Sequence, residues 1–176
     1  MRKWVLVVVS LVLSLTAIVF SARRFCIAPF PVMGQSTNQP PVLKPDSVLL
    51  PASEIDTYIK FYLGKTKDAV QSWQPSQADL DGLERNLPQI SSLKENVPGP
   101  GKHSENPEKY FRQYLAIMQS EKKKIFVNAV CGTAGDNTDN WRHHLQIVCD
   151  GGNCYWQAFY DPATQKFSNL MINGLG

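Results

Sequence analysis

Apolar residues first recur at helical spacing between Ser53 and Gly64. They fall three or four positions apart, as on one face of an amphipathic helix: Ile55, Tyr58, Ile59, Tyr62 and Leu63. Ser53 is a suitable N-cap because its hydroxyl oxygen accepts a backbone N–H that the first turn leaves free, and Gly64 is a typical stop. The pattern therefore predicts a helix from Ser53 to Gly64.

A second helix is predicted to begin after Ser76. Asp79 follows Ser76 at the spacing of a capping box, with Asp in the usual place of Glu. Pro88 is expected to end this helix, because Pro lacks the N–H that a helix interior needs. One apolar stripe runs along it: Leu80, Leu83 and Leu87.

From Tyr110 onward the period of apolar positions changes from 3.6 to 2. The segment Tyr110–Met118 is predicted to be a strand that leads through the polar turn Ser120–Lys123 into a second strand, Ile125–Cys131. An alternative interpretation of the first segment is a helix that starts at Pro107. Further strands are predicted for 145–149, 154–160 and 167–172.

These elements predict an α+β domain, in which two or three helices precede an antiparallel meander of four to five strands. The turn between the last two strands carries Pro162 at the second position of a type I turn. Gln165 then occupies the place where re-entry into the next strand commonly needs a positive φ.

The N-terminus carries an apolar run of nineteen residues, Trp4–Ala22, without a charge, Pro or Gly. As a helix this run would span about 28 Å, close to the hydrocarbon thickness of a bilayer. A cut after Ala22 would place Phe20 at the third position before it, where signal peptidase needs a small residue. Arg23 and Arg24 directly after the run oppose translocation of that end. The sequence therefore favours an uncleaved transmembrane anchor. A cleaved signal sequence is the alternative.

Residues 23–51 are rich in Pro and lack periodicity, which is typical of a semi-rigid linker, so the folded domain is predicted to span residues 52–176. The net charge of +3 does not indicate a nucleic-acid partner. Four of the 18 Lys and Arg residues flank the apolar run, and 15 acidic residues balance the rest. A nucleic-acid binder needs a concentrated basic face.

The predicted strand 154–160 has apolar residues on both faces. Trp156 and Tyr160 share one face with Ala158, and Tyr155 and Phe159 lie on the other. The structural interpretation is that helices cover one face and aromatic side chains cover the other. The functional interpretation is an exposed patch that binds a partner, made of Tyr155, Trp156, Phe159 and Tyr160.

Metal and cofactor sites are not indicated. His143 and His144 are adjacent and would point to opposite faces of a strand, His103 lies forty residues earlier, and no Cys or His pair has zinc-ligand spacing. The loop 132–140 is rich in Asp and Asn but lacks the EF-hand pattern, so a plain surface loop is expected. Signatures of serine hydrolases, phosphate loops and dinucleotide sites are absent.

The segment CDGGNCYWQAFYDPATQKFSNLMINGLG, preceded by WRHH and IFVNAVC, resembles a group of small exported bacterial proteins. They share a DGG turn, an aromatic strand, a YD..T..F turn and a final NG, and the likeness covers about the last seventy residues. The resemblance implies the strand order and an exported location. The group has no assigned activity, so no functional residue is transferred.

Two disulfide pairings remain open for Cys154. With Gly151 and Gly152 as a two-residue hairpin loop, Cys149 would lie opposite Cys154 and within disulfide reach. Cys131 ends an adjacent strand and competes with it. In the resembling proteins, positions like Cys131 and Cys154 occur together, and this favours a Cys131–Cys154 disulfide formed in an oxidising compartment.

Together these observations predict a non-enzymatic binding or accessory module. It is expected to be anchored in the cytoplasmic membrane by Trp4–Ala22, with its domain outside and an envelope protein as partner. A periplasmic or secreted protein is the alternative location. The alternative function is a small hydrolase or thiol enzyme that uses Cys131 or Cys149 with His143 or His144.

Overall fold

The structure is a computed structural model that describes residues 40–64, 70–95, 106–131 and 140–174. These residues form an α+β fold around a mixed six-stranded sheet, which confirms the predicted fold class. The strand order is β1-β3-β4-β5-β6, and β2 pairs with the C-terminal part of β3. The strands are β1 (Ser47–Leu49), β2 (Gln71–Ser72), β3 (Phe111–Gln119), β4 (Lys122–Val130), β5 (Tyr155–Asp161) and β6 (Lys166–Ile172).

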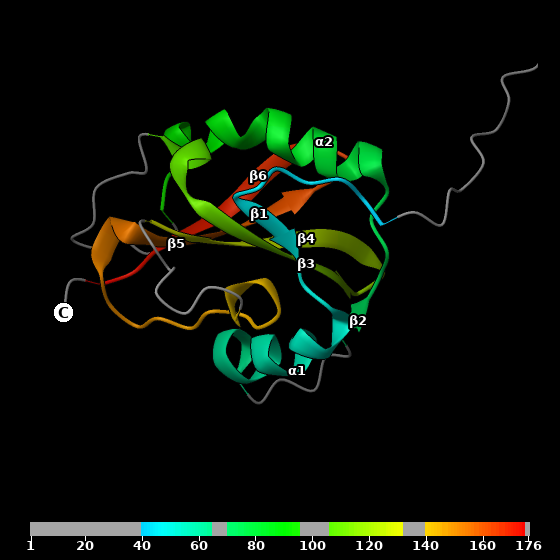
Figure 1. The fold of residues 1–176 in the computed structure, drawn as a ribbon, viewed down its shortest axis with the longest axis horizontal. Coiled ribbons are helices and arrows are strands. Elements are labelled where there is room, and N and C mark those ends of the chain that lie inside the picture. The colour runs from blue at the N-terminus through cyan, green and yellow to red at the C-terminus, as the bar shows by residue number, and fades with distance from the viewer. Residues whose placement is uncertain (1–39, 65–69, 96–105, 132–139, 175–176) are drawn as a thin grey trace, which may run out of the picture. The chain divides into compact units, whose positions relative to one another are not determined.

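Helices pack on both faces of the sheet (Figure 1). α2 (Gln77–Asn86) contributes to the core on one face, and α1 (Ile55–Tyr58) contributes to the core on the opposite face. The expectation that aromatic side chains alone cover the second face is therefore wrong. The other helical segments in the described ranges are a π-helix, Ile59–Leu63, and 3-10 helices at Ala52–Glu54, Leu87–Ser92, Pro107–Lys109, Asn140–Arg142 and Gly152–Cys154.

α2 begins where the sequence predicts it. Ser76 is the N-cap, its backbone N–H donates to Asp79 Oδ2 at 2.8 Å, and its hydroxyl accepts from the Asp79 N–H at 3.3 Å, so the capping box is confirmed. α2 ends at Asn86, just before Pro88, as predicted, although the chain continues as a 3-10 helix. Pro88 lies in the first turn of the 3-10 helix that follows α2, where the missing N–H breaks no helical bond.

The helix predicted from Ser53 exists, but Ser53 does not cap it. The chain already turns at Ala52, where the Glu54 N–H donates to the Pro51 carbonyl at 3.0 Å, so Ser53 lies inside the first turn. Gly64 ends the helical stretch as predicted, with a φ of 64° that few other residues adopt.

β3 to β6 form a four-stranded antiparallel meander. The strand interpretation of Tyr110–Met118 is confirmed, because β3 pairs with β4 from Phe111↔Val130 to Gln119↔Lys122. The turn between them is shorter than predicted and consists of Ser120 and Glu121, which both have positive φ. Two such residues make the tight turn that matches the twist of a hairpin.

β1 lies inside the segment that the sequence predicts to be a linker. It pairs in parallel with β3, from Ser47↔Arg112 to Leu49↔Tyr114, so the linker prediction is wrong for this part of the chain. The apolar run at 48–50 is too short to show a period, which is why the sequence pattern does not reveal it. The compact unit that contains the described residues begins at position 39.

The predicted strand Leu145–Cys149 is not a strand. The segment instead crosses successive strands of the sheet on the face that α1 covers. Leu145 and Ile147 pack in the hydrophobic core on that face. It is held by a row of side-chain amides that we call the amide ladder: Gln113 on β3, Asn128 on β4 and Gln157 on β5.

The amide ladder takes the place of strand pairing for this segment. Asn128 Nδ2 donates to Gln113 Oε1 at 2.9 Å, and Gln157 Nε2 donates to Asn128 Oδ1 at 3.2 Å. The same side chains satisfy the crossing backbone: Gln146 N–H donates to Gln113 Oε1 at 2.9 Å, and Asn128 Nδ2 donates to the Gln146 carbonyl at 2.9 Å. Since these peptide groups already have partners, the segment needs no neighbouring strand.

The predicted anchor Trp4–Ala22 lies outside the described residues. Within the described ranges, no helix has the length and apolar character of a membrane span.

The turn between β5 and β6 confirms the expectation for Gln165, whose φ is 54°. Asp161 Oδ1 accepts the N–H groups of Ala163 at 2.9 Å and Thr164 at 3.2 Å, which fixes the first part of the turn. The chain then re-enters β6 through the left-handed position of Gln165.

We predict that Gln165→Gly raises the free energy of unfolding by about 0.5–1 kcal/mol, because glycine adopts a positive φ without steric strain. Thr164→Gly is the matched control, since Thr164 has no positive φ and glycine there only adds freedom to the unfolded chain. Urea unfolding of both variants measures the difference. An equal loss of stability in the two variants contradicts the assignment.

Candidate functional site

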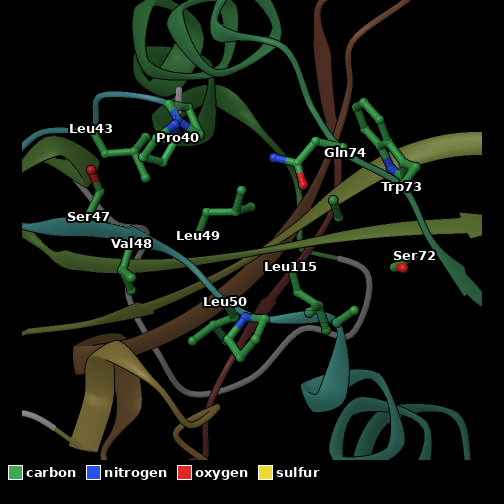
Figure 2. Close-up of a pocket in the computed structure, with 14 residues that line it drawn as sticks. Pro40, Leu43, Ser47, Val48, Leu49, Leu50, Ser72, Trp73, Gln74 and Leu115 are labelled. Carbon is green, nitrogen blue, oxygen red and sulfur yellow. The ribbon is translucent and has the colours of Figure 1, made fainter. Parts of the chain in front are cut away.

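The candidate site is a cavity of about 640 Å³ at one edge of the sheet (Figure 2). It lies where β1 and β2 approach the same edge of β3 from either end. Fourteen residues line it: Pro40, Pro41, Leu43, Ser47, Val48, Leu49, Leu50, Pro51, Ala52, Ser72, Trp73, Gln74, Leu115 and Ala116. None of these side chains is ionisable.

The cavity exists because the edge of β3 is covered in two pieces. The pairing with β1 ends at Leu49↔Tyr114, after which Pro51 leads the chain into a 3-10 helix. The pairing with β2 begins at Ser72↔Ile117. No residue of β1 or β2 is paired with Leu115 or Ala116, so the covering strands leave a gap at this part of β3.

The direction of the β3 peptide groups follows from the bonds beside this gap. Arg112 N–H donates to the Asp46 carbonyl, and the Tyr114 carbonyl accepts from Leu50 N–H, both at 2.8 Å on the β1 edge. Backbone groups alternate between the two edges of a strand, so those of Ala116 also point to this edge. The register of the β2–β3 pair, Gln71↔Met118 and Ser72↔Ile117, places Trp73 opposite Ala116, so the Trp73 N–H faces the Ala116 carbonyl.

Trp73 forms a fixed wall of the cavity. Its indole N–H lies 3.0 Å from the Ile117 carbonyl and 3.1 Å from the Lys124 carbonyl, so the ring is held against the β3–β4 hairpin. The ammonium of Lys123 lies 5.1 Å from the ring centroid, within the range of a cation–π contact.

Gln74 supplies a polar side chain from the segment that follows β2. Figure 2 shows its carboxamide turned toward the cavity. No hydrogen bond joins this carboxamide to another residue in the described part of the chain, and the side chain is exposed. The cavity therefore combines apolar walls with a carboxamide that is free to bind.

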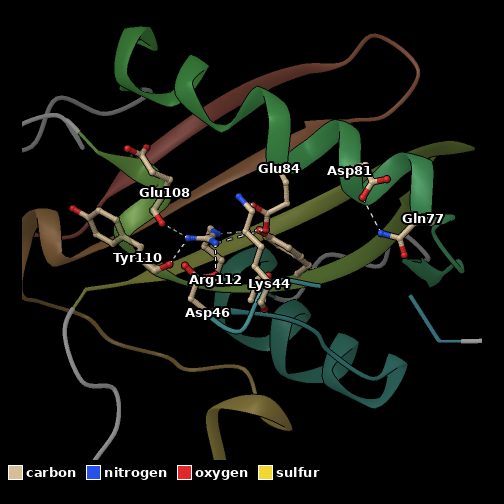
Figure 3. A network of polar contacts seen from close by, with 10 residues as sticks. Lys44, Asp46, Gln77, Asp81, Glu84, Glu108, Tyr110 and Arg112 are labelled. Atoms are coloured by element: carbon tan, nitrogen blue, oxygen red, sulfur yellow. Dashed lines mark hydrogen bonds and ion pairs between the residues drawn. The ribbon is translucent and has the colours of Figure 1, made fainter. Parts of the chain in front are cut away.

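The opposite wall is anchored by a buried ion network centred on Arg112 (Figure 3). Arg112 Nη2 lies 2.7 Å from Asp46 Oδ1, just before β1, and 3.7 Å from Glu84 Oε1 on α2. Arg112 Nε donates to the Tyr114 hydroxyl at 3.1 Å, and that hydroxyl donates to Glu84. The guanidinium thus ties β1, β3 and α2 together.

Burial and neighbouring groups shift the pKa values of Arg112 and Tyr114 in this network. Burial by itself lowers the pKa of Arg112, but its contacts with Tyr114, Glu84 and Asp46 outweigh it, so the pKa is raised and the guanidinium stays charged. Burial, followed by the charge of Glu84, raises the pKa of Tyr114 well above its ordinary value. Tyr114 therefore stays protonated and remains a hydrogen-bond donor.

The aromatic patch predicted from the sequence does not form a continuous exposed surface. Trp156 and Tyr160 are buried in the core under α2, and Tyr155 and Phe159 are partly buried. The predicted division between the two faces of β5 is correct, since Phe159 packs on the α1 side. Both faces of the strand are covered, which explains its aromatic composition without a partner.

A disulfide joins Cys131 and Cys154, whose Cα atoms lie 4.7 Å apart. The alternative Cys149–Cys154 pair is wrong, because Cys149 belongs to the crossing segment rather than to a strand opposite Cys154, and it is free and exposed. In the described ranges, no hydrogen bond joins Cys149 to His143 or His144.

The histidines take different roles. His144 Nδ1 lies 3.1 Å from Glu54 Oε1, and the other oxygen of this buried carboxylate accepts the Leu145 N–H at 2.9 Å, so the pair holds the crossing segment against the first helix. His143 is exposed. His103 and most of the loop 132–140 lie outside the described residues. Within them, no cluster of three or more His, Cys, Asp or Glu is placed to hold a metal ion.

Sequence reasoning missed the cavity. Trp73 and the apolar run at 48–50 carry a weak signal, because such residues outside a periodic pattern often contribute to a surface groove or to an edge strand. Their convergence on Ala116 depends on where two edge strands end, and no local pattern encodes this.

We predict that Arg112→Leu lowers the free energy of unfolding by about 3–5 kcal/mol, because it removes the buried charge that both Asp46 and Glu84 contact. Lys44→Leu is the control, since Lys44 also contacts Glu84, at 3.0 Å, but is half exposed. Its loss should be below about 1 kcal/mol. Denaturant unfolding compares the two. Small and equal losses would contradict a central role for Arg112.

Comparison with known proteins adds no family to this geometry. No protein-family model matches the sequence, and no match is found among curated proteins or solved structures. The resemblance to exported bacterial proteins therefore stays a prediction, and the assignment of function rests on the cavity and its surroundings.

Proposed function

We propose that the chain is a non-enzymatic binding module that takes its ligand in the cavity between β1 and β2. The observation that carries this proposal is the cavity between the ends of β1 and β2, where apolar walls surround the Gln74 carboxamide. A volume of about 640 Å³ is within the usual range for ligand sites.

The chemistry of the lining favours binding over catalysis. General acid–base catalysis needs a titratable side chain within reach of the substrate, and the cavity lining has none. The thiol-enzyme alternative has less support, because Cys131 is held in a disulfide and Cys149 has no hydrogen bond to either described histidine. A disulfide also favours an oxidising compartment as the location of the domain.

The proposed location is outside the cytoplasmic membrane. Trp4–Ala22 would be the anchor, and the Pro-rich residues that follow would hold the domain away from the bilayer. An envelope protein that shares this compartment is the proposed partner. Secretion after cleavage remains the alternative to anchoring.

Photo-crosslinking in the native host tests the cavity. We expect a benzoylphenylalanine at Ser72, which lines the cavity, to form an adduct with a defined envelope protein. The same probe at Gln71, the neighbouring exposed residue of β2, is the matched control, because successive strand residues face opposite sides. Mass spectrometry identifies the adducts. Failure to crosslink from Ser72, or the same adducts from both positions, argues against the cavity as the binding site.

Membrane fractionation tests the anchor separately. We expect the full-length protein to stay with the membrane after carbonate and high-salt extraction, because an uncleaved apolar helix is not released by either treatment. A variant without residues 4–22 should lose this behaviour. A soluble mature protein whose N-terminus lies near Ala22 would favour the cleaved signal.

A further inference from the structure

We infer that the cavity binds an uncharged ligand through a carboxamide whose N–H and C=O lie on the same side of the group, as in a primary amide or a lactam. This inference rests on the proposed function and adds the chemical class of the ligand. It depends on three observations: the open backbone groups of Leu49, the contact between Gln77 and Val42, and the absence of charge from the lining.

The N–H and C=O of Leu49 face away from the sheet. On either side of Leu49, the Asp46 carbonyl and the Leu50 N–H both bond to β3 at 2.8 Å. Backbone groups alternate between the two edges of a strand, so those of Leu49 point to the other edge of β1. β1 ends the strand order there, and no described residue bonds to either group. Leu49 therefore offers a donor and an acceptor side by side.

The chain that precedes β1 is kept from pairing with it. The Ser47 N–H donates to the Lys44 carbonyl at 3.0 Å in a tight turn, and a hairpin continued from this turn would place Val42 opposite Leu49. Instead, the Val42 N–H donates to Gln77 Oε1 at 2.8 Å, and Gln77 Nε2 donates to the Val42 carbonyl at 2.9 Å. Gln77 thus takes the backbone groups that would otherwise satisfy Leu49.

The cavity opens where this pairing is missing. Pro40 and Leu43 from the chain before β1 line it together with Leu49 (Figure 2). An open strand edge binds whatever supplies matching donors and acceptors. The backbone groups of Leu49 therefore lie at the wall of the cavity and are available to a ligand.

The contact between Gln77 and Val42 shows which group matches such a residue. A single carboxamide there satisfies both the N–H and the C=O of one residue, because its oxygen and one of its N–H groups lie on the same side. Leu49 presents the same pair of groups without a partner. A trans peptide bond has its N–H and C=O on opposite sides and cannot make both bonds, whereas a primary amide or a lactam can.

The walls require the rest of the ligand to be uncharged. No lining residue is ionisable, so a charged ligand would lose its hydration without gaining an ion pair. Leu50, Leu115 and the fixed ring of Trp73 offer apolar contact to the body of the ligand. Asn and Gln side chains of a partner protein carry this carboxamide, and so do free small amides.

NMR titration of the full-length, detergent-solubilised protein with caprolactam tests the inference. Caprolactam is an apolar ring with the required amide geometry, and we expect it to shift the Leu49 backbone amide and the Trp73 indole signals. N-Methylcaprolactam is the matched control probe, because it keeps the ring and the carbonyl but lacks the N–H. It should bind about five- to tenfold more weakly. Hexanoate, which is charged, should not shift Leu49.

Gln77→Ala tests the role of Gln77 in keeping the cavity open. The variant frees the backbone of Val42 to pair with Leu49, so caprolactam binding should weaken about tenfold and the Leu49 amide should exchange its hydrogen more slowly. Asp81→Ala is the matched control. It removes a different partner of Gln77 Nε2, at 2.8 Å, and should change the affinity less than twofold. Gln77 is exposed, and alanine favours a helix, so the variant should fold.

The outcomes separate the inference from the proposed function. If both lactams bind equally well, or if the Gln74 side chain shifts while Leu49 does not, recognition by Leu49 is overturned and the binding function stands. If no lactam binds but Ser72 forms its photo-adduct, the carboxamide is the wrong class of ligand. If neither occurs, the proposed function fails together with the inference.

Competition distinguishes the two sources of the carboxamide. If excess caprolactam suppresses the photo-adduct at Ser72, the group is carried by a side chain of the partner protein. If caprolactam shifts Leu49 and the adduct persists, the ligand is a free small amide.

Discussion

The arrangement of this domain depends on one buried positive charge. Arg112 lies near the start of β3 and is completely buried, so its guanidinium must be surrounded by acceptors. These acceptors come from three parts of the chain: Asp46 before β1, Glu84 on α2, and the carbonyls of Glu108 and Tyr110 at the start of β3. Their convergence fixes the height of α2 over the sheet and the register of the short edge strand β1.

Buried polar groups are satisfied in different ways on the two faces of the sheet. On the α2 side, charge is neutralised by charge around Arg112. On the α1 side, neutral amides bond to one another and to the backbone that crosses them, from Gln113 to Gln157. The first solution holds an edge strand in place, and the second holds a segment without secondary structure. The cavity lies apart from both networks, between the ends of β1 and β2 beside the middle of β3.

Elements with strong local signals could be predicted from the sequence. The capping box at Ser76, the alternation along β3 and β4, and the turn chemistry at Gln165 all operate within a few residues. The elements that were missed depend on distant partners. β1 is three residues long and forms because β3 is beside it, and the crossing segment is irregular because Asn128, far away in sequence, supplies its hydrogen bonds. The cavity results from contacts between residues that are distant in sequence, so local sequence patterns could not reveal it.

The amide ladder has a consequence for how this chain can diverge. A side-chain amide donates through one end and accepts through the other, so the orientation of Gln113 dictates that of Asn128, and Asn128 dictates that of Gln157. Changing one member to a carboxylate or an aliphatic residue would leave its neighbours with unmatched donors or acceptors. Evolutionary change at these positions should therefore be concerted, with substitutions at 113, 128 and 157 covarying among homologues whose remaining sequence has drifted beyond recognition.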